Sequence, residues 1–83
     1  MTEEKIMEAV YNPEKTDAEI LTLFWYNYLD LTTGTMLAFA QWFENSDNPL
    51  IEKVWAKFLD DETTYREFED LLLSVIDELE RTA

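Results

Sequence analysis

The sequence predicts an all-α protein, a compact bundle of four to five helices around a largely buried central helix. Three observations support this fold class. Residues 20–43 hold 16 apolar or aromatic side chains in 24 positions, with Asp30 as the only formal charge. The flanking segments repeat apolar residues at the three- and four-residue spacing of amphipathic helices. One glycine and two prolines in 83 residues favour long elements with short connections, so residues 1–83 are expected to form one acidic helical domain.

The N-terminal segment is expected to form a short helix from Glu3 to about Tyr11. Thr2 can cap this helix, and the apolar side chains at positions 6, 7, 10 and 11 share one face. Asn12 and Pro13 should end it, because the residue before a proline avoids helical geometry.

The apolar run 20–43 is the expected central element, starting with a capping box formed by Thr16 and Glu19. At 100° per residue, one narrow stripe is polar or amphipathic and the rest of the circumference is apolar. The stripe residues are Glu19, Thr22, Tyr26, Asp30 and Thr33. Such a helix is surrounded by other elements or by lipid. A break or kink is expected at residues 32–35, around Gly34, with a threonine capping the next helix. A single helix from Asp17 to Asn45 is the alternative, and it would lower the count from five to four.

Three further segments complete the expected bundle. The first has an apolar face of Met36, Phe39, Ala40 and Phe43. The second runs from Pro49 to about Leu59, with Asn48 as its cap and proline at the first helical position. Its apolar stripe consists of Leu50, Ile51, Val54, Trp55, Phe58 and Leu59.

The last segment has the clearest amphipathic pattern. Thr64 and Glu67 have the spacing of a second capping box. The expected buried seam consists of Tyr65, Phe68, Leu72, Val75 and Leu79, widened by Leu71 and Ile76. Its alternating three- and four-residue spacing is typical of a helix packed nearly parallel or antiparallel to a neighbour.

Composition excludes several kinds of chemistry. The chain has no cysteine and no histidine, which excludes disulfides, the usual zinc sites, and thiol or imidazole catalysts. Ser46 and Ser74 have no histidine base, and the sole glycine, Gly34, cannot build a phosphate-binding loop. The acids at 60–62 lack the alternating ligands and central glycine of an EF-hand. The expectation is a protein that is not an enzyme and uses no cofactor or metal.

The sequence also favours a cytoplasmic protein, in the host cell if the protein is viral. The chain opens without the basic region of a signal peptide. Asn27, Asp30 and Gln41 interrupt the apolar run, and basic residues cluster at neither flank, so a membrane span is not expected.

The charge balance indicates the class of partner. Nineteen acids and six bases give a formal net charge of −13, yet 47% of the residues are hydrophobic. The chain should therefore fold instead of remaining disordered. A surface with this charge repels nucleic acid and anionic lipid. The expected partner is a basic protein, in particular one that binds nucleic acid, with no direct contact to nucleic acid or membrane.

The candidate binding residues lie between positions 60 and 80, where nine acids accompany a single base, Arg66. The candidates are Asp60, Asp61, Glu62, Glu67, Glu69, Asp70, Leu73, Asp77, Glu78 and Glu80. On a helix, the carboxylates from 67 to 80 span about 20 Å. Their mean spacing approaches the ~3.4 Å between phosphates along one DNA strand. The alternative is a solvated face that keeps the domain soluble. Against it, these acids crowd the C-terminal half of a helix and mostly lack a basic residue four positions later.

Two apolar features leave alternatives open. Leu73 lies within the acidic face. It is either an apolar anchor for a partner, an ordinary exposed leucine, or part of a second packed side of the helix.

Twelve aromatic residues are many for so small a domain. Tyr26 falls on the polar stripe, and Trp42 and Trp55 fall at the edges of their apolar faces. Core packing accounts for such residues, and a self-associating structural or adaptor module with an aromatic homodimer interface is the alternative.

In size, acidity and expected helical content, the chain resembles phage-encoded inhibitors of host defence, such as anti-CRISPR and anti-restriction proteins. It equally resembles the acidic immunity proteins that block nuclease toxins. The resemblance is one of composition, covers no aligned motif and carries over no residues. Together with the charge pattern, it leads to the hypothesis of a small inhibitor that mimics nucleic acid.

Overall fold

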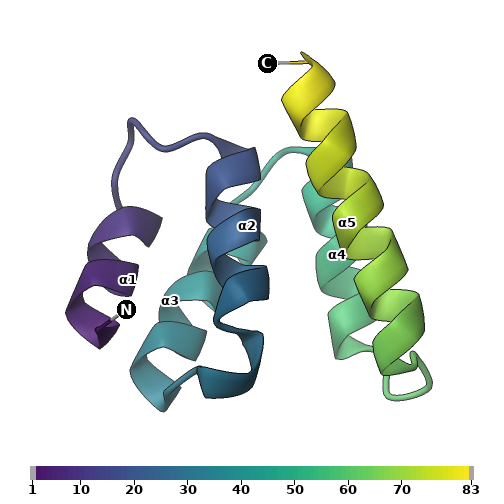
Figure 1. Cartoon of the computed structure of the whole chain (residues 1–83), viewed down its shortest axis with the longest axis horizontal. Coiled ribbons are helices and arrows are strands. Elements are labelled where there is room, and N and C mark those ends of the chain that lie inside the picture. Colours follow the sequence, from purple (N-terminus) through teal and green to yellow (C-terminus); the bar gives the residue numbers. More distant parts are fainter. Residues whose placement is uncertain (1, 83) are drawn as a thin grey trace.

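The computed structural model describes residues 2–82, and this part of the chain contains five α-helices, one 3₁₀ turn and no strand (Figure 1). The elements are α1 (Glu3–Val10), α2 (Asp17–Tyr26), η1 (Tyr28–Asp30), α3 (Thr33–Glu44), α4 (Pro49–Leu59) and α5 (Tyr65–Thr82). The predicted all-α class is therefore confirmed, with the larger of the two expected helix counts.

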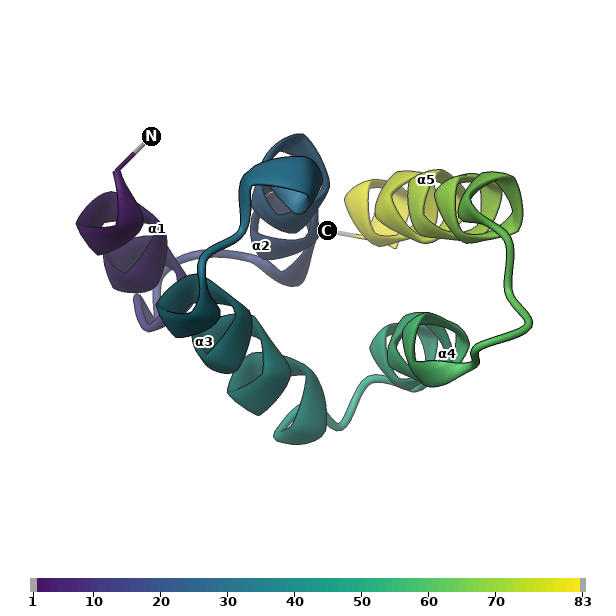
Figure 2. The same cartoon turned by 90° about the horizontal axis from the view of Figure 1, so that it is seen from below.

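The helices form two layers. Figure 2 shows α1, α2 and α5 in one layer, above α3 and α4 in the other. Helix α2 lies between α1 and α5 and runs antiparallel to α5 (Figure 1). Within α2, Leu21 and Phe24 are fully buried, and Glu19 and Tyr26 are the residues exposed to solvent. The prediction of a largely buried central helix is therefore confirmed.

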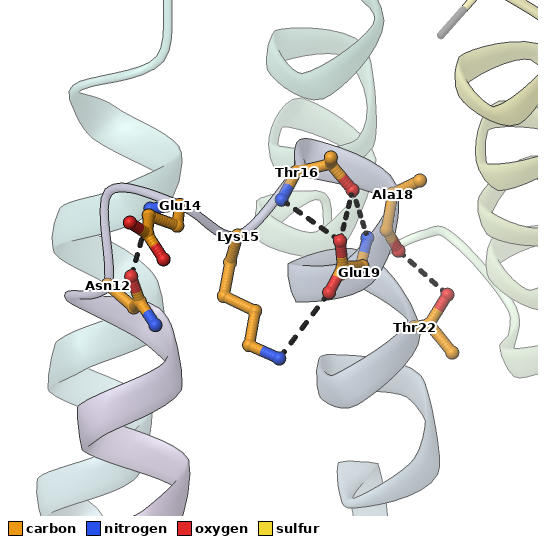
Figure 3. A network of polar contacts seen from close by, with 7 residues as sticks. All are labelled: Asn12, Glu14, Lys15, Thr16, Ala18, Glu19 and Thr22. Atoms are coloured by element: carbon orange, nitrogen blue, oxygen red, sulfur yellow. Dashed lines mark hydrogen bonds and ion pairs between the residues drawn. The ribbon is translucent and has the colours of Figure 1, made fainter.

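The start of α2 is fixed by local polar contacts (Figure 3). The Thr16 hydroxyl oxygen accepts a hydrogen bond from the Glu19 backbone N–H at 3.2 Å, and the Glu19 carboxylate accepts one from the Thr16 N–H at 3.5 Å. This is the predicted capping box. The Lys15 ammonium lies 3.4 Å from the same carboxylate. The backbone and hydroxyl donors of Thr16, and then Lys15, hold the pKa of Glu19 below its ordinary value.

The break in the central run comes earlier than predicted. Helix α2 ends before Asn27, whose backbone and side-chain N–H groups both donate to the Leu23 carbonyl oxygen, at 3.2 and 2.9 Å. An asparagine that bonds the backbone locally in this way competes with helix continuation. Thr32 caps α3 in a capping box with Thr35, as expected of a threonine in this run. Gly34 lies inside the first turn of α3 and has no positive φ, so its expected place at a break was wrong.

Phe24 is the centre of the core. Its ring packs edge-on against five other aromatic rings, with centroid distances from 5.1 to 6.4 Å. The five partners are Tyr28, Phe39, Phe43, Phe58 and Phe68. These residues come from η1, α3, α4 and α5, so one side chain of α2 links both layers.

Four residues of the predicted apolar surfaces are more than half exposed, contrary to expectation: Tyr11, Leu29, Leu59 and Tyr65. Leu29 lies in η1, past the end of α2, and the other three lie at helix ends, where helical spacing still assigns a side chain to the buried face although the packed neighbour no longer covers it. Tyr11 instead donates a hydrogen bond from its hydroxyl to the Gln41 side-chain oxygen, at 2.9 Å.

Among residues 2–82, no helix has the length and apolar character needed to cross a membrane.

Candidate protein-binding surface

Helix α5 carries most of the predicted site residues and is held by an apolar inner face. Phe68, Leu72, Val75, Ile76 and Leu79 are buried, and α5 contacts both α2 and α4. Leu71 is half-buried, so the predicted seam is confirmed except at Tyr65. At the start of the helix, the Glu67 N–H donates to the Thr64 hydroxyl oxygen at 3.2 Å. This bond is half of the predicted capping box; within residues 2–82 the reciprocal bond from Thr64 is not formed.

The outer side of α5 presents six carboxylates, which we call the α5 acidic face: Glu67, Glu69, Asp70, Asp77, Glu78 and Glu80. All are exposed except Glu69, which is half-buried. Glu80 borders a groove on α2, and helical spacing places Glu69 on the same side. Glu67 and Glu78 lie on the opposite side, and Asp70 and Asp77 point away from the core. The carboxylates therefore cover the solvent side of one rigid helix.

One member of the α5 acidic face is neutralised from within the chain. An Arg81 guanidinium nitrogen lies 2.7 Å from a carboxylate oxygen of Asp77, and both side chains are largely exposed. Among residues 2–82, no lysine or arginine lies within ion-pair distance of the other five carboxylates. The bases of the chain therefore leave most of this charge uncompensated.

The three acids before α5 lie in the turn that follows α4. Asp60, Asp61 and Glu62 are exposed, and a side-chain oxygen of Asp60 accepts the Glu62 backbone N–H at 3.0 Å. This bond closes an Asx turn, so Asp60 has a structural role at this position. Its carboxylate retains free lone pairs toward solvent.

Leu73 is 46% exposed. Its helical position lies between Asp70 and Asp77, on the side toward α2. The structure therefore places an accessible apolar side chain inside the α5 acidic face, which the sequence left open.

The aromatic excess is mostly absorbed by the core. Trp55 stacks between Phe43 and Phe58, at centroid distances of 4.8 and 5.4 Å. Trp42 is half-buried and packs edge-on against Phe43 at 4.9 Å. Tyr26 is 79% exposed, in agreement with its predicted place on the polar stripe.

The surface also contains two sizeable apolar grooves that sequence reasoning missed. One, of about 560 Å³, follows the outer face of α2, where Ala18, Ile20, Leu23 and Tyr26 line it. The other, of about 580 Å³, lies between η1, α3 and α4; we call it the leucine groove. Residues 15–26 line most of the first groove, and residues 28–40 line most of the second. Neither groove was expected, because the apolar run 20–43 predicts a helix that its neighbours cover on nearly all sides. Among residues 2–82, no group of acidic residues is arranged to hold a metal ion.

Comparisons of the chain with protein-family models, with curated proteins and with solved structures find no match. The functional argument therefore depends on the charges and surfaces of this chain alone.

Proposed function

We propose that the chain is a protein-binding inhibitor that uses the α5 acidic face as a mimic of nucleic acid. The face occupies a groove of lysine and arginine side chains in a nucleic-acid-handling protein and so excludes the natural ligand. The observation that supports this proposal is the set of five carboxylates on one helix without an ion-pair partner among residues 2–82.

The position of these charges works against the stability of the free chain. Asp77, Glu78 and Glu80 lie in the last turns of α5, where the helix dipole disfavours negative charge. Carboxylates three or four residues apart also repel one another. A basic groove would relieve both effects, because its ammonium and guanidinium groups replace the missing partners of the carboxylates.

The dimensions also agree with a phosphate backbone. The acidic face extends about 20 Å along the helix, with a mean charge spacing close to the ~3.4 Å between phosphates of one strand. The match is one of charge density, since Asp70 and Asp77 leave a gap that contains Leu73 and Ser74. In this gap Leu73 offers the partner protein an apolar contact that a nucleic acid cannot offer. This contact raises the affinity of the partner for the inhibitor relative to its nucleic acid.

The mechanism has two stages. Long-range attraction between the chain, with its formal charge of −13, and a basic surface accelerates encounter. The helix then docks without refolding, because its packing on α2 and α4 already fixes the backbone from which the carboxylates project. Inhibitors of CRISPR or restriction nucleases, and immunity proteins against nuclease toxins, are the classes that this mechanism fits. In either class the inhibitor acts in the cytoplasm, which is the host's if the protein is viral.

Affinity capture from the source cells tests the proposal. The tagged chain is incubated with lysate at about 50 mM and about 200 mM salt, and bound proteins are identified by mass spectrometry. The test variant is Asp70→Lys with Glu78→Lys, which reverses two acids that have no ion-pair partner. The control is Glu4→Lys with Glu8→Lys, which changes the net charge equally on exposed positions of α1.

The expected result is capture of a basic nucleic-acid-binding protein that is lost at the higher salt, lost with the α5 variant and retained with the α1 variant. Excess duplex DNA or RNA should release it. Equal capture by the two variants would show that net charge alone attracts the protein, and the proposal would then be wrong.

A further inference from the structure

The groove of about 560 Å³ on the outer face of α2, which we call the α2 groove, adjoins the α5 acidic face. Ala9 of α1 and Glu80 of α5 both line it, and α2 lies between these two helices (Figure 2). Among the apolar lining residues, Ala18 is buried, whereas Tyr26 is exposed at the last position of α2. The groove therefore combines a recess with a protruding aromatic ring.

The α2 groove is not neutral. Among residues 2–82, the charged side chains that line it are Lys15, Glu19 and Glu80. The Lys15 ammonium lies 3.4 Å from the Glu19 carboxylate (Figure 3), so these two charges compensate one another. Glu80 is exposed and has no ion-pair partner in the described part of the chain. The uncompensated charge of the groove is therefore negative and comes from α5.

Helix α5 extends this combination of apolar and acidic groups along its edge toward α2. Four residues follow one another there at four-, three- and four-residue spacing, so they share one stripe of the helix. We call this the α5 edge stripe: Glu69, Leu73, Ile76 and Glu80. Its two carboxylates are about 16 Å apart along the axis, at ~1.5 Å per residue, and both apolar members lie between them.

Glu69 adds an energetic argument. Its side chain is half-buried, and within residues 2–82 no lysine or arginine lies at ion-pair distance from it. A partly buried carboxylate without a cation costs more free energy than a fully solvated one. Cations of a partner would therefore gain most at the ends of the α5 edge stripe, where they would compensate both Glu69 and Glu80.

We propose that the α2 groove and the α5 edge stripe together bind an amphipathic helix of the partner protein. This inference rests on the proposed function and specifies the segment of the basic partner that the chain contacts. A partner stripe of basic, apolar, apolar and basic side chains, at the same four-, three- and four-residue spacing, complements the α5 edge stripe. The spacing reads the same in both directions, so the partner helix fits either way along α5.

The shape of the surface favours a helix. A groove that runs beside one helix accepts the apolar face of another, with anchors three and four residues apart. Tyr26 and Leu73 supply exposed apolar contacts for such anchors. Asp70 and Asp77 point away from the core, so they remain available to basic side chains elsewhere on the partner.

The charges argue against other occupants. Nucleic acid and anionic lipid are repelled by the formal charge of −13. A second copy brings the same negative charge. A neutral apolar ligand would leave Glu69 and Glu80 without cations. A basic amphipathic helix satisfies the apolar recess and both carboxylates at once.

Fluorescence anisotropy with a labelled helical peptide tests the proposal. The paired peptide is rich in alanine and carries lysine, leucine, leucine and lysine at four-, three- and four-residue spacing. The shifted peptide has the same composition, with its leucines on the side of the helix opposite the lysines. The neutral peptide has glutamine in place of both lysines. The whole chain, titrated at about 50 mM salt, should bind the paired peptide at least about tenfold tighter than either control.

Variants of the chain locate the contact. Tyr26→Gln and Leu73→Gln each remove an apolar contact without changing the net charge, and each should weaken binding of the paired peptide at least about tenfold. Leu37→Gln makes the same kind of exchange at an exposed leucine of α3, outside the proposed surface. It should leave binding unchanged. Circular dichroism checks that each variant retains its helices.

Several results would overturn the proposal. Binding of none of the peptides, or equal binding of the paired and shifted peptides, would show that the apolar stripe is not recognised. Equal binding of the paired and neutral peptides would assign the surface to a neutral apolar ligand. A wild-type dimer in sedimentation equilibrium that Tyr26→Gln dissociates would assign it to a second copy.

Capture from lysate separates failure of this inference from failure of the proposed function. If Tyr26→Gln captures the basic protein as well as the wild-type chain does, the proposed function stands and the helix-binding surface is wrong. If the α5 and α1 charge variants capture it equally, the proposed function is wrong. The peptide titration then still decides whether the surface binds a basic helix.

Discussion

The guanidinium of Arg81 lies 2.7 Å from the carboxylate of Asp77, one turn earlier on α5. Among residues 2–82, this is the single ion pair made by any carboxylate of the α5 acidic face. Both side chains are largely exposed, so the pair contributes at most about 1 kcal/mol to stability. Its larger effect is to reduce the charge that the face offers to a partner.

Replacing Arg81 with glutamine is therefore predicted to lower the stability of the fold only slightly while strengthening the binding of a basic partner. The free energy of unfolding, measured by urea titration, should fall by no more than about 1 kcal/mol. Capture of a basic partner should persist to a higher salt concentration, because Asp77 becomes free. Unchanged or reduced salt resistance would mean that Asp77 does not take part in the contact.

Phe24 should be the most sensitive position of the core. It is fully buried and packs against five rings from four other elements, so truncation would leave a cavity at the junction of both layers. Phe24→Ala is expected to cost about 3–5 kcal/mol, a large share of the roughly 5–15 kcal/mol available to a small domain. Near-ultraviolet circular dichroism and urea titration would measure the loss. Tyr26→Ala, at an exposed position of the same helix, is the control and should cost much less.

Glu19 gives a prediction with a defined pH direction. Its pKa is lowered in the folded chain by the Thr16 donors and Lys15, so the ionised form stabilises the fold. This contribution is complete above the ordinary carboxyl pKa of 4.5 and is lost as the pH falls through the lowered value. Glu19→Gln keeps a side chain that can complete the capping box but removes the titration. The stability difference between wild type and Glu19→Gln should therefore shrink as the pH falls below about 4.5; urea titrations across this range would measure it, and a constant difference would contradict the assignment.

Gly34→Ala is predicted to stabilise the chain. Gly34 lies in the first turn of α3 without a positive φ, and alanine favours a helix over glycine by about 0.5–1 kcal/mol. An added methyl group would meet the carboxylate of Glu3, the flexible end of an exposed side chain, which can move away. Thermal unfolding should show a higher midpoint. If Gly34→Ala is instead destabilising and Glu3→Ala restores stability, the Glu3 carboxylate is held more firmly than this account requires.

Helix starts were predictable from the sequence because they depend on local contacts. Thr2, Thr16 and Asn48 cap their helices as their positions indicated. The end of α2 was missed because Asn27 uses its side chain to bond a carbonyl within its own turn, a choice that apolar periodicity does not reveal. Exposure of Tyr65 was missed for a different reason, since spacing along one helix does not show where its neighbours end.

The candidate site was predictable in part. Placing the carboxylates outside required only the apolar seam of α5, which the spacing of Phe68, Leu72 and Val75 already defined. The spacing of Asp77 and Arg81 allows an ion pair one helical turn apart, whereas the exposure of Leu73 depends on tertiary packing. The leucine groove could not be predicted, because most of its lining belongs to the apolar run 20–43, whose composition predicts burial on nearly all sides.

The most direct test of the nucleic-acid-mimic proposal is a displacement titration. A captured partner is bound to a fluorescent duplex that it recognises, and the chain is added while anisotropy is recorded. The wild-type chain and Glu4→Lys with Glu8→Lys are predicted to displace the duplex equally well. Asp70→Lys with Glu78→Lys should need at least about tenfold more protein, equivalent to about 1.4 kcal/mol. Equal displacement by all three proteins, or a duplex that stays bound while the chain also binds, would contradict the proposal.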